Sequence, residues 1–152
     1  MKNVTPDQQA MLATWQQHTY AEFVLKDADA ALATMTENPH VLLIASGVVR
    51  VGRAAVREFY ADKFLPNIPP DLEITTVSQT FGDDRIVEEM AVRFTHTIDM
   101  DWLLPGVRPT GRRVSRAVGA RRDTDRGGSP VHRSLGAGPR RYFHFRQNLE
   151  QE

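Results

Sequence analysis

The sequence predicts a single α+β domain in which N-terminal helices pack on a mostly antiparallel sheet. Apolar residues recur at helical spacing in the segments 6–25 and 52–64. Two long segments of alternating character, 72–81 and 86–100, flank Gly82-Asp83-Asp84, a sequence typical of a hairpin turn. The 152 residues are enough for one domain with a real hydrophobic core.

Three helices are predicted in the first half of the chain. Thr5-Pro6-Asp7 is a strong helix start, because threonine caps, proline suits the first turn and aspartate favours the positive helix end. A second, short helix is expected over residues 27–36, since Asn38-Pro39 interrupts it. The third helix, 52–64, ends before Pro66.

Strands are predicted around and after the third helix. Residues 40–45 have the composition of a buried strand, and after Gly47 the segment 48–51 can return as its partner. In the long segment 86–100, alternation predicts which side chains face the core. The core face carries Glu88, Met90, Val92, Phe94, His96 and Ile98.

The last part of the chain does not continue this pattern. Residues 109–111 (Pro-Thr-Gly) turn toward another strand, but 112–146 hold ten arginines, frequent glycine and almost no apolar alternation. By composition we expect loop or disorder there, which leaves the sheet incomplete with an open edge. The sequence therefore divides into a pocket domain over 1–113 and an atypical arginine-rich tail over 114–152.

The composition limits the kinds of site and the cellular location that we expect for this protein. The chain has no cysteine, so it forms no disulfide and no cysteine-ligated metal site. Lys2 is followed by no apolar run, and no segment reaches membrane-spanning length, so we expect a soluble cytoplasmic protein that has no membrane partner. The net charge of zero hides an asymmetry, because the arginine-rich tail is basic and the rest is acidic.

Three segments resemble a known family. Residues 35–39 (Met-Thr-Glu-Asn-Pro), 52–60 (Gly-Arg-Ala-Ala-Val-Arg-Glu-Phe-Tyr) and 102–113 (Trp-Leu-Leu-Pro-Gly-Val-Arg-Pro-Thr-Gly-Arg-Arg) are similar to those of bacterial SnoaL-like proteins. This group belongs to the nuclear transport factor 2-like superfamily, with polyketide cyclases and ketosteroid isomerases. The resemblance covers residues 10–114 and implies a cone-shaped fold with a curved sheet.

The resemblance also implies a pocket between the helices and the sheet, a small hydrophobic ligand, a homodimer and no cofactor. Candidate pocket residues are the aromatic and neighbouring side chains that these elements carry. They are Trp15, Tyr20, His40, Phe59, Tyr60, Phe64, Met90, Phe94 and Trp102. Aromatic residues at helical spacing are also typical of plain core, so this set is a hypothesis about the ligand.

Glu88 and His96 are the candidate catalytic residues. A carboxylate and an imidazole on an apolar face must be paired or face a cavity, because burying them unpaired is costly. Such a pair could move a proton beside a substrate carbonyl, as SnoaL-like cyclases and ketosteroid isomerases do. The alternative is structural: His96 is a satisfied core histidine and Glu88 lies in solvent at the hairpin end.

The sequence thus predicts a small-molecule pocket protein that carries out cofactor-free proton transfer on a hydrophobic carbonyl compound. The alternative is a non-catalytic ligand-binding or dimerisation module, because one fold hosts many functions. No metal site is expected, since the histidines lack ligand spacing and no carboxylate joins them.

The tail allows two interpretations. The family continues from Pro-Thr-Gly into a valine-rich strand, and here a shifted reading frame of residues 116–122 can give Val-Pro-Leu-Val-Leu-Val-Val. The same frame over 134–139 can give Leu-Trp-Ala-Gln-Ala, so we hypothesise a frameshift near Val114. Otherwise the tail is a genuine basic arm. Binding of nucleic acid is not expected of it, because its stacking residues Tyr142, Phe143 and Phe145 cluster at one end.

Overall fold

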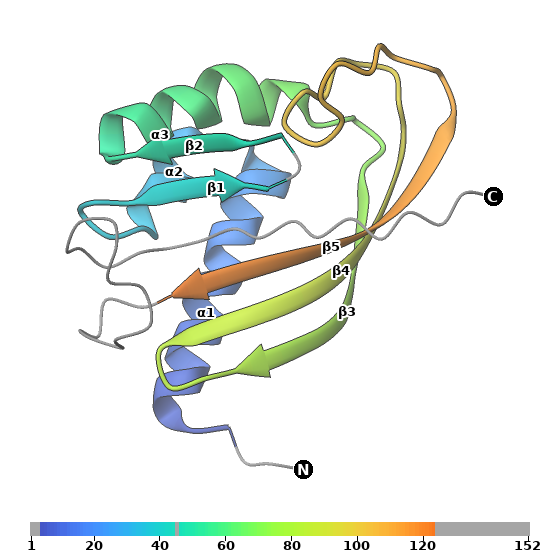
Figure 1. The fold of residues 1–152 in the computed structure, drawn as a ribbon. Coiled ribbons are helices and arrows are strands. Elements are labelled where there is room, and N and C mark those ends of the chain that lie inside the picture. Colours follow the sequence, from blue (N-terminus) through green and yellow to red (C-terminus); the bar gives the residue numbers. More distant parts are fainter. Residues whose placement is uncertain (1–3, 45, 124–152) are drawn as a thin grey trace.

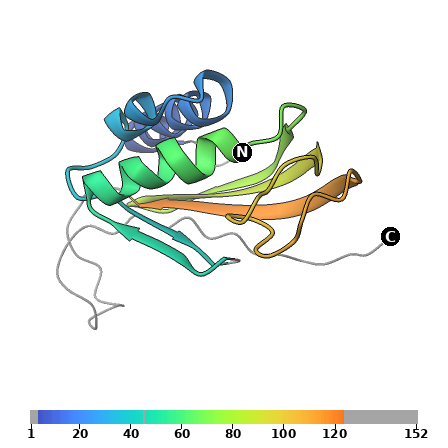
Figure 2. The same cartoon turned by 90° about the horizontal axis from the view of Figure 1, so that it is seen from above.

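The structure of the chain is a computed structural model, which describes residues 4–44 and 46–123. The helices form one layer, and the two antiparallel sheets form a second layer that packs against it (Figures 1 and 2). The α+β class predicted from the sequence is confirmed. The space between the two layers holds the core and the candidate site.

The first helix extends across the longer sheet. α1 (Pro6–Tyr20) begins with a capping box in which Thr5 and Gln8 each accept a hydrogen bond from the backbone N–H of the other. It continues without a break into η1 (Ala21–Leu25), one turn of π-helix. The helix ends at Lys26, which has a left-handed φ of 52°. The long helix predicted from the sequence is confirmed.

Two further helical segments complete this layer. α2 (Ala28–Ala33) begins at Asp27, whose side chain accepts hydrogen bonds from the backbone of the first turn. α3 (Arg53–Phe59) continues as η2 (Tyr60–Phe64), again a π-helical turn, and ends in the short η3 (Leu65–Asn67). Both predicted helices are confirmed, the first of them slightly shorter than expected.

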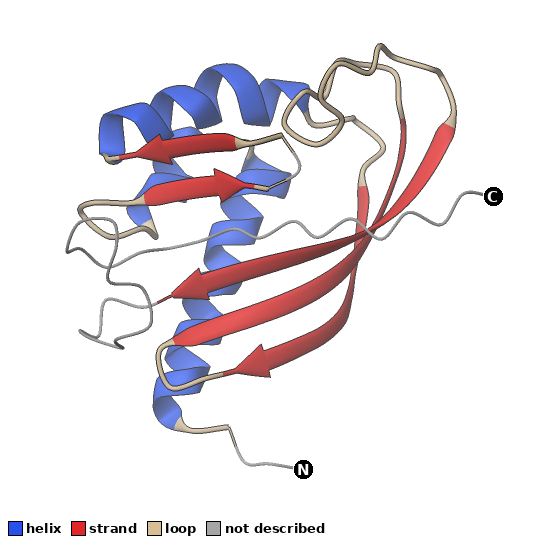
Figure 3. Cartoon of the chain, viewed as in Figure 1, coloured by secondary structure: helices blue, strands red, loops and turns tan. Residues whose placement is uncertain are grey.

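The strands form two separate antiparallel sheets (Figure 3). β1 (His40–Leu43) pairs with β2 (Val48–Val51) in a small hairpin. β3 (Glu73–Phe81), β4 (Arg85–Thr95) and β5 (Arg113–Asp123) form the longer sheet in that order. The long strands curve around α1 (Figure 1).

β5 corrects one expectation. Loop or disorder was expected from Arg112 onward, but β5 pairs with β4 along the full length of that strand. Its alternation is weak yet sufficient: Val118 and Ala120 are buried and Val114 is half-buried against the core. Pairing also satisfies backbone groups that an open edge of β4 would leave unpaired. The strand therefore crosses the expected boundary at residue 113, whereas residues 124–152 lie outside the described residues.

β4 is shorter than predicted. It ends at Thr95, whose backbone N–H and hydroxyl both donate to the carboxylate of Asp71. His96 still exchanges backbone hydrogen bonds with Gly111 and Arg112, but Gly111 has a φ of 68° and turns the chain away. The last predicted strand residues therefore belong to the loop that leads to Trp102.

The predicted core face of β4 is confirmed over most of its length. Glu88, Met90, Val92, Phe94 and His96 are all buried, and Phe94 is fully so. Met90, Val92 and Phe94 belong to one hydrophobic cluster with the buried aromatic residues of α1, α3 and η2. None of the described helices is long and apolar enough to cross a membrane.

Candidate functional site

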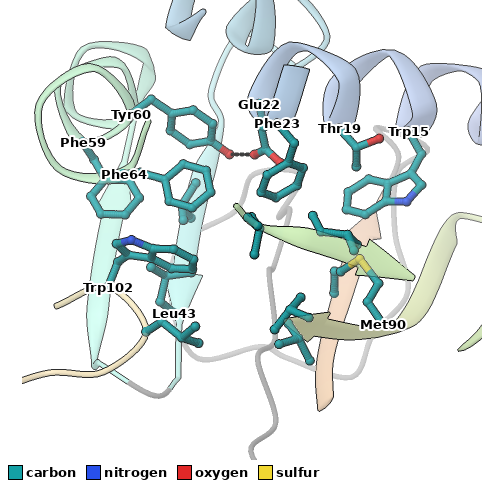
Figure 4. Close-up of a pocket in the computed structure, with 17 residues that line it drawn as sticks. Trp15, Thr19, Glu22, Phe23, Leu43, Phe59, Tyr60, Phe64, Met90 and Trp102 are labelled. Carbon is teal, nitrogen blue, oxygen red and sulfur yellow. Dashed lines mark hydrogen bonds between the residues drawn. The ribbon is translucent and has the colours of Figure 1, made fainter. Parts of the chain in front are cut away.

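A cavity lies between the helical layer and the longer sheet. It encloses about 650 Å³, which includes the space at its mouth that is open to solvent. Figure 4 shows the side chains around it, with aromatic rings gathered at one end and Trp15 and Met90 at the other. The lining is Trp15, Thr19, Glu22, Phe23, Val41, Leu43, Phe59, Tyr60, Phe64, Leu72, Ile74, Met90, Val92, Trp102, Leu103, Val118 and Ala120.

Glu22 is the charged residue of this lining. Its residue is only 3% exposed, which is exceptional for a glutamate. The Tyr60 hydroxyl donates to Glu22 Oε1 at 2.6 Å, and His18 Nε2 lies 3.0 Å from the same oxygen. Both partners are buried as well. Two buried polar side chains thus hold one oxygen of a carboxylate that lines an apolar cavity.

The other ring nitrogen of His18 is fixed by α2. Nδ1 lies 2.7 Å from Thr34 Oγ1, and the Thr34 hydroxyl itself donates to the carbonyl oxygen of Ala31 at 2.7 Å. Since Thr34 has used its hydrogen, its oxygen accepts from His18, so Nδ1 carries a hydrogen. The ring is also held by Trp15, which stacks on it with centroids 5.9 Å apart.

The three polar side chains of this cluster meet around Glu22 Oε1. His18 Nε2 and the Tyr60 hydroxyl both contact this oxygen, and they lie 3.4 Å from each other. The second carboxylate oxygen of Glu22, Oε2, makes no hydrogen bond within the described residues, and the residue lines the cavity.

Two π-helical turns place the residues of this cluster. Glu22 lies in η1 and Tyr60 begins η2, so each extra-wide turn carries one side chain of the hydrogen-bonded pair. Such turns are rare and occur frequently at functional sites, because the additional residue redirects the side chains of the turn. In Figure 4 the Tyr60 hydroxyl and the Glu22 carboxylate point toward each other.

The aromatic end of the cavity is built around Phe64. The Trp102 ring meets it edge to face at 4.8 Å, and Tyr60 does so at 5.3 Å. Trp102 is anchored in turn, because its indole N–H donates to the carbonyl oxygen of Asn67 at 3.1 Å. These rings form a preorganised apolar wall for a ligand.

Most of the predicted pocket residues do line the cavity. Trp15, Phe59, Tyr60, Phe64, Met90 and Trp102 are all in its wall. Three others are not. Tyr20 is 53% exposed on the outer side of α1, Phe94 is fully buried in the core, and half-buried His40 lies outside the lining.

The predicted catalytic residue Glu88 is buried at 4% exposure, but it does not line the cavity. Its carboxylate accepts hydrogen bonds from the Trp15 indole, from the Thr76 hydroxyl at 2.6 Å and from the Gln79 amide at 3.0 Å. Three donors satisfy it, so Glu88 is paired, as the sequence requires of a buried carboxylate, and it does not lie in solvent. The bond from Trp15 ties α1 to the sheet.

His96 does not join Glu88. Eight residues of extended chain separate them, which is roughly 26 Å, because side chains on one strand cannot approach along its length. His96 is 1% exposed, and its Nδ1 lies 3.4 Å from Thr110 Oγ1. Like Glu88, it is absent from the cavity wall. The two candidates lie on one face as predicted but do not form a pair.

Glu22 is not among the site residues predicted from the sequence. The signal was present, because His18 and Glu22 are four residues apart on the helix face that also carries Trp15 and Thr19. Two ionisable residues in an apolar stripe indicate either a cavity or a buried pair.

Among the described residues, no three histidines, aspartates or glutamates are grouped as they would be to hold a metal ion.

Comparison with known proteins places this architecture. No family model matches the chain, and no curated protein matches its sequence. A SnoaL-like polyketide cyclase from Jannaschia sp. CCS1 matches in structure with a TM-score of 0.69 and 16% identity, over 97% of this chain and 92% of that one. The chain has the nuclear transport factor 2-like fold.

Two further solved structures agree with this fold. An NTF2-like protein of unknown function from Burkholderia pseudomallei K96243 has a TM-score of 0.59 and 12% identity, over 90% of this chain and 89% of that one. A ketosteroid isomerase-like protein from Erwinia carotovora atroseptica SCRI1043 has a TM-score of 0.55 and 17% identity, over 93% and 97%. The resemblance to SnoaL-like members of the nuclear transport factor 2-like fold is confirmed at the level of the fold.

Proposed function

We propose that this chain binds a small hydrophobic carbonyl compound in its cavity and transfers a proton on it without a cofactor. Glu22, rather than Glu88 or His96, is the general acid–base group. The observation that carries this proposal is the position of Glu22, a nearly buried carboxylate whose Oε2 has no hydrogen-bond partner among the described residues and whose side chain lines the cavity.

The chemistry would use the two carboxylate oxygens differently. Oε1 is fixed by Tyr60 and His18, which orient the group. Oε2 takes a proton from a carbon beside the substrate carbonyl, and the electron pair of that C–H bond moves into the enolate. The same Oε2 then returns the proton to another atom of the substrate. A ligand that fills the apolar cavity would displace water from it, which strengthens these interactions.

The neighbours in structure support this chemistry only as an analogy. A SnoaL-like polyketide cyclase and a ketosteroid isomerase-like protein share the fold, but the fold does not determine the reaction. The alternative function is ligand binding without turnover. It is favoured by one observation, that Glu22 Oε1 is already satisfied by two buried partners and can have a purely structural role.

Deuterium exchange tests the proposal. We expect the protein to accelerate exchange of the α-hydrogens of a bicyclic aryl ketone such as hydroxytetralone in deuterium oxide, followed by proton NMR. Glu22→Gln should abolish the acceleration. His96→Ala and Glu89→Gln should retain it, because neither residue lines the cavity. Saturable binding of the ketone without exchange would favour the alternative, and acceleration that survives Glu22→Gln would exclude Glu22 as the base.

A further inference from the structure

The side-chain hydrogen-bond donors of the cavity wall are already occupied. The Tyr60 hydroxyl donates to Glu22, and the Thr19 hydroxyl donates to the carbonyl oxygen of Gln16 at 3.1 Å. The indole N–H of Trp15 donates to Glu88, and that of Trp102 to the Asn67 carbonyl oxygen. No lysine, arginine or histidine belongs to the lining that the structure describes. A ligand that only accepts hydrogen bonds finds no free side-chain donor here.

The wall does offer an acceptor. Glu22 Oε2 makes no hydrogen bond within the described residues, since Tyr60 and His18 both contact Oε1. Because Glu22 lines the cavity, Oε2 is the carboxylate oxygen that a ligand can reach. The cavity is therefore complementary to a ligand that brings its own donor.

We propose that the carbonyl ligand of this cavity also carries a hydroxyl: an apolar body with one phenolic, enolic or alcoholic O–H that donates to Glu22 Oε2. This inference rests on the proposed function, because it narrows the carbonyl compound of the same cavity to one that brings a donor. A carboxylate oxygen has two lone pairs, so Oε2 can accept this bond and still face the carbon that loses its proton. It excludes two other classes. A ligand anion would face the carboxylate with no cation in the wall, and an ether or ester of the same shape would leave Oε2 unsatisfied.

A hydroxyl suits the rest of the wall as well. It satisfies Oε2 without bringing a further charge into the apolar cavity. The aromatic wall around Phe64 and Trp102 suits a flat, apolar body behind the hydroxyl.

A matched pair of probes tests the inference. Naphthol and methoxynaphthalene share one ring system, but only naphthol has a hydrogen to donate. We expect the wild-type protein to bind naphthol roughly tenfold more tightly or better, measured by isothermal titration calorimetry. Glu22→Gln should remove or reverse this preference, because the amide can place a donor where Oε2 was. Glu89→Gln is the matched control, since Glu89 is exposed and bonded to Ser78.

The outcomes separate the two proposals. Equal affinity of the wild-type protein for both probes overturns the hydroxyl inference and leaves the cavity as a ligand site, and this comparison needs no variant to fold. A preference that persists in folded Glu22→Gln also overturns it. If neither probe binds, the proposed function fails together with the inference. Preference for naphthol in the wild type and in Glu89→Gln, lost in Glu22→Gln, supports both.

Discussion

Tyr60 donates its hydroxyl hydrogen to Glu22 Oε1 across 2.6 Å, although the two residues are 38 positions apart and lie on different helices. The bond joins the two π-helical turns at the centre of the helical layer. It also places the proposed base against the cavity. Its contribution to stability can be measured without any knowledge of the ligand.

Tyr60→Phe removes this donor and keeps the ring. We expect a loss of about 2 kcal/mol in the free energy of unfolding, because hydrogen bonds to charged groups contribute more than neutral ones. Urea denaturation followed by circular dichroism measures the loss. Tyr20→Phe is the control, since Tyr20 is 53% exposed and should change stability by less than about 0.5 kcal/mol. Equal effects of the two variants would contradict a structural role for the Tyr60 hydroxyl.

Glu88→Ala should be among the most destabilising substitutions on β4. It leaves the donors of Trp15, Thr76 and Gln79 without their acceptor, so we expect a loss of about 3 kcal/mol. Glu89→Ala, one position along on the exposed face, should cost far less. Thermal denaturation of the two variants measures the difference in their stability. Similar melting temperatures would mean that Glu88 does not tether α1.

Arg116→Val should stabilise the protein. Arg116 lies opposite Val92 in the register of β4 and β5, and its Nη1 is buried with no hydrogen-bond partner among the described residues. Valine removes that unsatisfied group and suits a strand, so we expect a gain of about 1 kcal/mol in urea denaturation. Arg93→Val, on the exposed face, is the control. A loss of stability in Arg116→Val would show that the arginine has a favourable role.

The same position bears on the reading frame. In the shifted frame that the sequence allows, residue 116 is a valine, which is the residue that the core face of β5 favours. We therefore keep the frameshift near Val114 as a proposal. Sequencing the gene across codons 108–146 tests it: an inserted or missing base supports the shift, and an intact frame makes the arginine-rich tail genuine.

Asp71 should make stability depend on pH. Hydrogen bonds from Thr95 and the charge of Arg113 hold the pKa of the Asp71 carboxyl below its ordinary value. A lowered folded pKa means that the stabilisation is complete above the unfolded value and is lost as the pH falls through the folded value. Asp71→Asn should therefore destabilise at neutral pH, and the difference from wild type should shrink in acid. A difference that is constant down to acid pH would contradict this linkage.

The homodimer implied by the family resemblance remains a prediction. β3 is largely exposed, and Val77 at its bulge is 66% exposed, so this strand offers apolar surface to a second copy. Sedimentation velocity should give twice the chain mass for the wild type and the single mass for Val77→Asp. A monomeric wild-type protein would refute the prediction.

Local signals in the sequence were sufficient for most of the fold. Thr5-Pro6-Asp7 marks the start of α1, and the alternation around Met90 and Phe94 identifies the core face of β4. β5 was missed because Arg116 and its neighbours interrupt the apolar pattern. β5 forms because it pairs with the open edge of β4, and a local window of the β5 sequence does not include that edge.

The candidate site was harder to predict, because its members meet only in three dimensions. Glu22 alone resembles a solvated helix residue, and the side chain that encloses it, Tyr60, comes from another helix. Glu88 was placed on the correct face, but its donor from Trp15 arrives from α1 and gives it a structural role. Alternation predicts the face of a side chain, and it does not predict which partner reaches that face.

The division of the strands into two sheets has a mechanical consequence. Val41 and Leu43 of the cavity wall belong to the β1–β2 hairpin, whereas Met90 and Val118 belong to the longer sheet, and no ladder joins the two sheets within the described residues. Side-chain packing and the connecting segments therefore join these two parts of the wall, and neither hydrogen-bond ladder depends on the other. A change in the spacing of the two sheets would alter the width of the cavity and leave both ladders intact.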